Sequence, residues 1–152
     1  MPERGRSREV AVNRRAYHDY FIDETHEAGL VLLGTEVKSL RGGRANLRDG
    51  FVRLEANEAW LENVHISPYP MGGYANHEPL RPRKLLLHSD EIASLIGKVK
   101  QKGYTLIPLR LYFARNRAKV EVGLARGKRQ YDKRQALATA DARREMERAL
   151  RH

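Results

Sequence analysis

The chain has 152 residues and a formal net charge of +10, from 29 basic and 19 acidic residues. This length suits one domain with a substantial core, and so large a positive charge indicates a polyanionic partner, above all nucleic acid. The absence of cysteine excludes disulfides and thiolate metal sites and suits a reducing compartment. The sequence has no long apolar run for a membrane span and no signal-peptide core, so we expect a cytoplasmic protein with no membrane partner.

The basic residues gather towards the C-terminal end. Residues 126–152 contain nine basic and four acidic side chains, which is half of the net charge. Residues 1–12 are polar and basic, and we expect them to be flexible until bound. The sequence therefore predicts three parts: a flexible arm over 1–12, a folded nucleic-acid-binding domain over 13–126, and a basic tail over 127–152.

The first third of the folded part predicts strands around one short helix. Residues 17–24 are rich in aromatic side chains and predict a strand, and Glu27-Ala28-Gly29 is expected to break it. Residues 34–43 predict a short helix, because their apolar residues have helical spacing and Gly42 suits a helix end.

The middle of the chain predicts a hairpin, a long loop and a second helix. Residues 47–54 and 59–64 have the composition of strands, and Asn57-Glu58 predicts the turn between them. Residues 67–83 contain four of the six prolines and predict a long exposed loop. Ser89 suits a helix cap, and an apolar stripe of helical spacing follows it, so we expect this helix to cover one end of the sheet.

The clearest pattern in the chain is a hairpin over residues 104–125. Apolar side chains recur at every second position on both sides of a polar turn at 114–117, which is typical of half-buried antiparallel strands. Pro108 cannot donate a hydrogen bond to a neighbouring strand, so the first strand should lie at a sheet edge or have a bulge there.

Together these elements predict a mainly β protein of the α+β kind, with two or three helices. We expect a small antiparallel β-barrel of the OB type with a basic C-terminal tail, and a split α+β sheet is the alternative. In the tail, residues 135–150 are helix formers, but their apolar stripe is mostly alanine. Alanine buries too little area to offset the entropy of ordering, so we expect a tail that is disordered when free and helical on a partner. A helix docked on its own barrel is the alternative.

The sequence offers little for catalysis. No two histidines have the spacing of a helical zinc pair, and neither a phosphate-binding glycine loop nor a glycine-flanked nucleophilic serine is present. The acidic residues that could hold a divalent cation for phosphodiester chemistry are Asp19, Asp23, Glu24, Glu27 and Glu36. Acids at alternating strand positions are more often a solvated face, so we expect no enzyme activity, no cofactor and no metal site.

Several strings in the chain resemble the SsrA-binding protein family, also called small protein B. They are Asn13-Arg14-Arg15 with His18-Asp19-Tyr20, Glu27-Ala28-Gly29-Leu30, Gly34-Thr35-Glu36-Val37-Lys38-Ser39-Leu40-Arg41, Arg83-Lys84-Leu85-Leu86-Leu87, Lys119-Val120 and Gly127-Lys128-Arg129-Gln130-Tyr131-Asp132-Lys133-Arg134. The resemblance runs from about residue 13 to residue 134, and it is specific because these strings occur in the same order.

The resemblance implies an OB-like barrel that binds the tRNA-like domain of transfer-messenger RNA (SsrA). It implies delivery of that RNA with elongation factor Tu to stalled ribosomes for trans-translation, with the protein at the decoding centre and its tail in the empty mRNA channel. It implies RNA-binding roles for Asn13, Glu27, Glu36, Lys38, Arg41, Leu86 and Lys119, and we add Lys128 and Arg129 from the basic segment. The tail residues implied in accommodation on the ribosome are Tyr131, Asp132, Lys133 and Arg134.

One position departs from some members of the family, which carry histidine where this chain has Tyr131. Both side chains stack on a base, but only histidine titrates near neutral pH. Two other functions stay open at this point. One is a general module for single-stranded RNA, and the other is a metal-dependent RNA hydrolase that needs Asp19 or Glu24.

Overall fold

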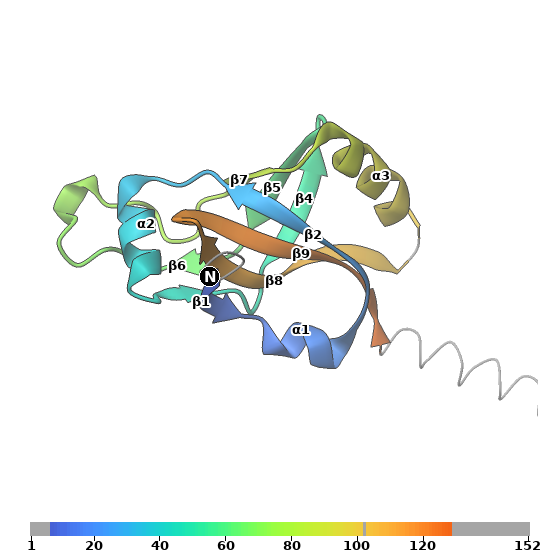
Figure 1. Cartoon of the computed structure of the whole chain (residues 1–152), viewed down its shortest axis with the longest axis horizontal. Coiled ribbons are helices and arrows are strands. Elements are labelled where there is room, and N and C mark those ends of the chain that lie inside the picture. The colour runs from blue at the N-terminus through green and yellow to red at the C-terminus, as the bar shows by residue number, and fades with distance from the viewer. Residues whose placement is uncertain (1–6, 102, 129–152) are drawn as a thin grey trace, which may run out of the picture.

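The protein is described by a computed structural model that covers residues 7–101 and 103–128. Figure 1 shows its elements in chain order. They are β1 (Ser7–Val12), α1 (Arg14–Asp19), β2 (Tyr20–Leu30), α2 (Gly34–Arg41), β3 (Ala45–Asn46), β4 (Phe51–Glu55), β5 (Glu58–Glu62), β6 (His65–Ile66), the 3-10 helix η1 (Gly73–Ala75), β7 (Arg83–Leu86), α3 (Ser89–Val99), β8 (Tyr104–Ala114) and β9 (Arg117–Gly127).

Seven of the strands form one antiparallel sheet in the order β1-β8-β9-β2-β7-β5-β4, and β3 pairs with β6 alone. Strand β4 also lies beside β8, which brings the two halves of the sheet together around the core. Within residues 7–101 and 103–128 the two end strands, β1 and β4, do not pair with each other, so the hydrogen-bonded sheet does not close into a complete barrel. The expected fold class is confirmed as a mainly β, small-barrel-like fold with three helices.

The inner face of this sheet forms the core. Leu111 and Val120, which face each other on β8 and β9, are both fully buried, as are Leu85 on β7 and Leu61 on β5. Helix α2 adds Leu40 to the same cluster. Each fully buried side chain of this size stabilises the fold by about 1.5–3 kcal/mol, so the alternating pattern that predicted the strands also supplies their stability.

The hairpin predicted at residues 104–125 is confirmed as β8 and β9. Its turn consists of Arg115 and Asn116, both with positive φ (53° and 64°), which is the geometry that matches the twist of two paired strands. The register shifts between Pro108 and Arg110, so the proline lies at a bulge. Strand β8 pairs with β1 on one side and β9 on the other, so the alternative of an edge position does not apply.

Three expectations for the N-terminal region need correction. Residues 7–12, expected to be part of a flexible arm, form β1 along β8. The strand expected over 17–24 begins only at Tyr20, and residues 14–19 form helix α1, because the Asn13 side chain accepts from the backbone N–H of Ala16 and caps a helix. Glu27-Ala28-Gly29 does not break a strand, since β2 continues through it to Leu30 and pairs there with β7.

Helix α3 lies at one end of the sheet (Figure 1), and a histidine on β2 ties it there. His26 Nδ1 is 2.7 Å from Glu91 Oε2 on α3, and its Nε2 is 2.9 Å from Glu24 Oε1. The Lys98 ammonium on α3 also donates to Glu24. Burial alone favours the neutral imidazole, but the hydrogen bonds to Glu24 and Glu91 raise the pKa of His26 above its ordinary value. The imidazolium therefore links α3 to the sheet.

This link predicts a pH-dependent stability. Since folding raises the pKa of His26, its contribution is complete below its ordinary pKa of about 6.5 and is lost as the pH rises through the higher folded-state pKa. We expect H26Q to lower the free energy of unfolding in urea by about 1–3 kcal/mol near pH 6, and by less near pH 9. The control is H65Q, which changes an exposed histidine on β6. An equal loss at both pH values would contradict the ion-pair account.

Candidate nucleic-acid interface

Three neighbouring strands align side chains on the outer face of the sheet. Gly29 on β2 lies opposite Leu86 on β7 and opposite Lys119 on β9. Glu27 lies two residues before Gly29 and therefore points to the same face. Leu86 is 55% exposed, although it is a large apolar residue. The register of β2 thus brings together an acid, an exposed leucine and a lysine that are far apart in the sequence.

The surface is hollowed beside this row. One hollow, next to the β8–β9 turn, is lined by Glu27, Arg115, Arg117 and Lys119. A second hollow adjoins it, because Arg117 and Lys119 line both. The apolar walls of the second hollow are Leu30, Leu32, Val37, Leu86 and Phe113. A basic rim around an apolar floor suits a ligand with phosphates outside and flat bases inside.

Helix α2 presents its two expected basic residues at different places. The guanidinium carbon of Arg41 lies 5.1 Å from the ring centroid of Phe113, which borders the second hollow. Lys38 faces the long loop instead, with Nζ 5.5 Å from the ring centroid of Tyr69. Both side chains are exposed. Arg41 therefore extends the basic rim, and Lys38 offers a second cationic point beside the loop.

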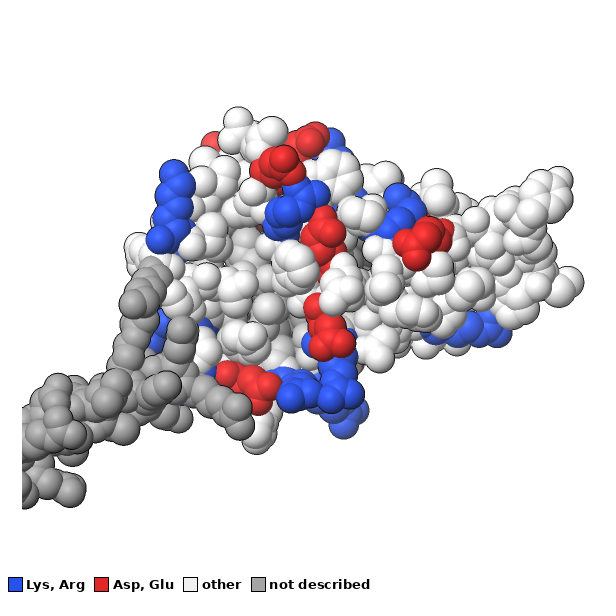
Figure 2. Space-filling model, turned by 180° about the vertical axis from the view of Figure 1, so that it is seen from behind, with Lys and Arg blue, Asp and Glu red and all other residues white. Residues whose placement is uncertain are grey.

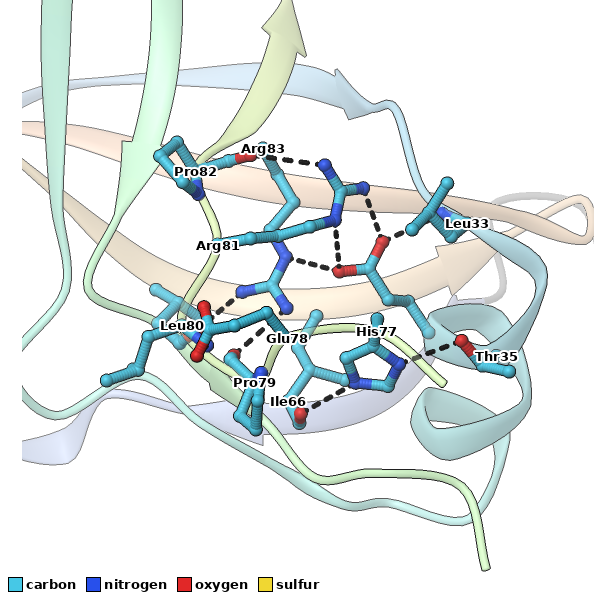
Figure 3. A network of polar contacts seen from close by, with 12 residues as sticks. Leu33, Thr35, Ile66, His77, Glu78, Pro79, Leu80, Arg81, Pro82 and Arg83 are labelled. Carbon is cyan, nitrogen blue, oxygen red and sulfur yellow. Dashed lines mark hydrogen bonds and ion pairs between the residues drawn. The ribbon is translucent and has the colours of Figure 1, made fainter. Parts of the chain in front are cut away.

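Glu36, also expected to touch RNA, is fully buried. Its carboxylate pairs with two guanidinium groups, those of Arg81 in the loop and Arg83 on β7, and both arginines are labelled in Figure 3. Arg81 donates to both oxygens at 3.0 and 2.6 Å, Arg83 Nε donates to Oε2 at 2.6 Å, and the backbone N–H of Leu33 donates to Oε1 at 2.7 Å. Burial alone would favour the neutral acid, but these donors hold the pKa of Glu36 below its ordinary value. The structure gives this carboxylate a structural role in place of contact with a base.

Arg83 completes this buried cluster. It is fully buried too, and it donates to the carbonyl oxygens of Val64 at 2.6 Å and Pro79 at 3.0 Å. In the same region His77 lies 2.9 Å from the Thr35 hydroxyl and 2.8 Å from the carbonyl oxygen of Ile66 (Figure 3). The loop over 67–83 is largely exposed, as expected, and His77 and Arg83 anchor it to α2 and β6.

Asn13 is buried as well and has protein partners on every side. Its Nδ2 donates to the carbonyl oxygen of Pro108 at 3.0 Å and lies 3.4 Å from that of Leu47, and its Oδ1 accepts from Ala16. The side chain joins α1 to the bulge of β8. Asn13 therefore has a structural position, and its buried amide offers no exposed group for the expected RNA contact.

Lys128 directly follows β9, at the opposite end of that strand from Lys119. Lys128 Nζ donates to the carbonyl oxygen of Tyr17 at 3.3 Å and lies 5.3 Å from the ring centroid of Phe21. The remaining expected residues lie outside the described part of the chain: Arg129, Tyr131, Asp132, Lys133 and Arg134.

Sequence reasoning missed several residues of this face. Arg115, Arg117 and Phe113 surround the hollows, and the Tyr112 hydroxyl donates to the Glu27 carboxylate. Because neighbouring residues of a strand point to opposite faces, and Leu111 points into the core, the alternation of β8 predicts that Tyr112 points to the outer face. Its contact with Glu27 depends on strand order, which the alternation does not give.

The side of the molecule seen from behind in Figure 2 has no comparable basic surface among its described residues. Figure 2 shows acidic and basic side chains interleaved along a central column there, and no broad basic area. Asp19 and Glu24, the acids needed by a metal-dependent hydrolase, pair with protein cations: Asp19 with Arg15 and Glu24 with Lys98. No group of side chains suited to a metal ion is found within 7–101 and 103–128. Nor is any helix in that part of the chain long and apolar enough to cross a membrane.

The fold, together with the outer face that carries Gly29, Leu86 and Lys119, is typical of a small β-sheet protein that binds nucleic acid. A family profile described as "SmpB protein" matches residues 10–152. A protein called "SsrA-binding protein" from Thermobifida fusca (strain YX) is 63% identical, over 93% of this chain and 89% of the relative. One with the same name from Geobacillus kaustophilus (strain HTA426) is 56% identical, over 99% and 97%.

A solved structure is also similar. It is described as "tmRNA-SmpB: a journey to the center of the bacterial ribosome", has a TM-score of 0.67 and 58% identity, and covers 78% of this chain and 83% of that chain. The chain therefore belongs to the SmpB family, as the sequence strings indicated.

The buried position of Glu36 predicts a large effect on stability. E36Q leaves Arg83 charged and buried with no counter-ion, so we expect the free energy of unfolding to fall by about 3–5 kcal/mol. The matched control is E58Q, which removes an exposed partner of Lys84 on the same strand, β7, and should lose less than about 1 kcal/mol. Urea titration measures both.

The Glu36 contribution should also depend on pH. Because folding lowers the pKa of Glu36, its stabilisation is complete above its ordinary value of about 4.3 and is lost as the pH falls through the folded-state pKa. Similar losses in E36Q and E58Q would show that the buried pair does not hold the loop to α2.

Proposed function

We propose that this protein binds the tRNA-like domain of transfer-messenger RNA and brings it to stalled ribosomes for trans-translation. The observation that carries the proposal is the aligned row of Leu86, Gly29 and Lys119, with Glu27 beside it. Membership of the SmpB family and the "SsrA-binding protein" relatives support it. The solved relative described with tmRNA and the bacterial ribosome supports the ribosome as second partner.

The chemistry of the row suits a folded RNA. Lys119, Arg117 and Arg41 are placed for phosphates around the hollows, while Leu86 offers an apolar surface to a base. Glu27 accepts hydrogen bonds, and a carboxylate pairs with the amino group of an exposed base. Structured RNA exposes such bases and its 2′-hydroxyls where strands turn, so a small mixed surface can recognise it. This binding needs neither a catalytic group nor a cofactor.

The further parts of the proposal concern the second partner. We infer that elongation factor Tu accompanies the RNA complex and that the protein stands at the decoding centre. We also infer that the tail over 127–152 enters the empty mRNA channel and becomes helical there. The charge of residues 126–152 supports this, since this segment, which starts at the end of β9, carries half of the net charge.

The RNA surface predicts distinct effects for its apolar and its charged members. We expect K119A to weaken binding to a tRNA-like RNA and to reduce the slope of log affinity against log salt by about 1, because one phosphate contact is lost. L86A should weaken binding by roughly fivefold to tenfold with an unchanged slope, because it removes only apolar contact. Filter binding at several salt concentrations measures both.

The control for these variants is K100A, which removes an exposed lysine just after α3. It should leave both affinity and slope unchanged. A competition between the tRNA-like RNA and an unstructured oligomer of equal length separates this proposal from a general single-strand-binding module. Equal affinity for the two RNAs would contradict the proposal.

The division between domain and tail makes a separate prediction. A chain that ends after Gly127, or one with Asp132, Lys133 and Arg134 replaced by alanine, should keep its affinity for the tRNA-like RNA to within about tenfold, because the aligned row is intact. Both should fail to support tagging on stalled ribosomes in a reconstituted translation assay. Equal loss of RNA binding and tagging would refute this division.

A further inference from the structure

Two acidic side chains face each other on the RNA surface. Glu27 on β2 lies directly opposite Glu121 on β9, and like charges in that position destabilise a sheet. Each has a different partner. Arg110 Nε lies 3.5 Å from Glu121 Oε1, and Arg110 Nη1 is 3.1 Å from Glu9 Oε2 on β1. The Tyr112 hydroxyl donates to the Glu27 carboxylate. A cation therefore neutralises Glu121, while a neutral donor holds Glu27.

Tyr112 is held firmly enough to set the position of Glu27. Its residue on β8 pairs with Lys119 on β9, so its side chain must cross β9 to reach Glu27 on β2. The side chain is only 5% exposed, and the Arg110 guanidinium carbon lies 4.5 Å from its ring centroid. Burial and the hydrogen bond to Glu27 raise the pKa of Tyr112 well above its ordinary value, so the hydroxyl stays protonated and donating.

The arrangement leaves the neighbouring lysine available. Within residues 7–101 and 103–128 the Lys119 side chain forms no ion pair, although Glu27 and Glu121 occupy the next row of the same face. Both carboxylates are bound elsewhere, one by Tyr112 and the other by Arg110. The Lys119 ammonium is therefore left to pair with a phosphate.

We propose that Tyr112 is a positioning residue for RNA binding, which fixes the Glu27 carboxylate and keeps it from pairing with Lys119. This inference rests on the proposed function, since it assigns Glu27 and Lys119 to the RNA. Its physical basis is preorganisation: groups held in place before binding lose less freedom when the RNA arrives. Tyr112 itself is almost fully covered and acts through its neighbours.

The test removes one oxygen atom. In Y112F the freed Glu27 turns to Lys119, so affinity for a tRNA-like RNA should fall by about threefold to tenfold, the size of one ordinary hydrogen bond. The slope of log affinity against log salt should fall by up to about 1, as in K119A. The control is Y104F, which removes the same kind of bond, a tyrosine hydroxyl that donates to Asp23 at 2.9 Å, from another part of the sheet. It should change neither quantity.

A double-mutant cycle separates positioning from a general structural effect. In an E27Q background, Y112F should change affinity by less than about twofold and leave the salt slope unaltered, because the two residues act through one contact. Unchanged affinity and slope in Y112F, or an equal effect in both backgrounds, would overturn the proposal. A wild-type chain with no preference for the tRNA-like RNA would instead overturn the proposed function.

A measurement on the free protein covers the case in which Y112F unfolds. E27Q should lower the pKa of the Tyr112 phenol towards its ordinary value, visible as phenolate absorbance at lower pH. An unchanged tyrosine titration in E27Q would show that the hydroxyl does not bind Glu27 in solution, and the inference would fail.

Discussion

The register of β2 is the constraint on which the RNA surface depends. This strand pairs with β9 along most of its length and with β7 at its end, so that Gly29 has a partner on each side. A shift by one residue would send Glu27 into the core and Ala28, which is fully buried, to the surface. The core pattern on the inner face therefore fixes which side chains meet on the outer face. The proposed RNA-binding row follows from the same alternation that stabilises the sheet.

The buried polar residues divide the expected site into two layers. Glu36 with its two arginines, and Asn13 with its backbone partners, lie under the surface and connect elements that carry exposed groups. The Glu36 cluster links α2, which bears Lys38 and Arg41, to the start of β7, which bears Leu86. A family motif does not distinguish such supporting residues from those that touch RNA. Burial does, and it leaves Glu27, Leu86, Lys119 and Arg41 as the residues that we propose for direct contact.

The sequence predicted most of what depends on local pattern. The β8–β9 hairpin, its turn, the bulge at Pro108 and helix α2 follow from alternation, spacing and the chemistry of proline, and the structure confirms them. Helix α1 was missed because Tyr17, Tyr20 and Phe21 suggest a strand, while the capping by Asn13 depends on a contact with Pro108 far along the chain. The pairing of β1 with β8 was missed because polar residues in an edge strand resemble those of a flexible arm. The Tyr112–Glu27 contact spans three strands, and no local pattern contains it.

We propose that the row built on β7, β2 and β9 is where the tRNA-like RNA binds. Titration of that RNA into isotope-labelled protein, followed by amide chemical shifts, tests this proposal. The largest shifts should fall on residues 27–30, 84–87 and 113–119, with α3 nearly unaffected. Shifts concentrated on α3 and β4, with those three segments unchanged, would contradict it.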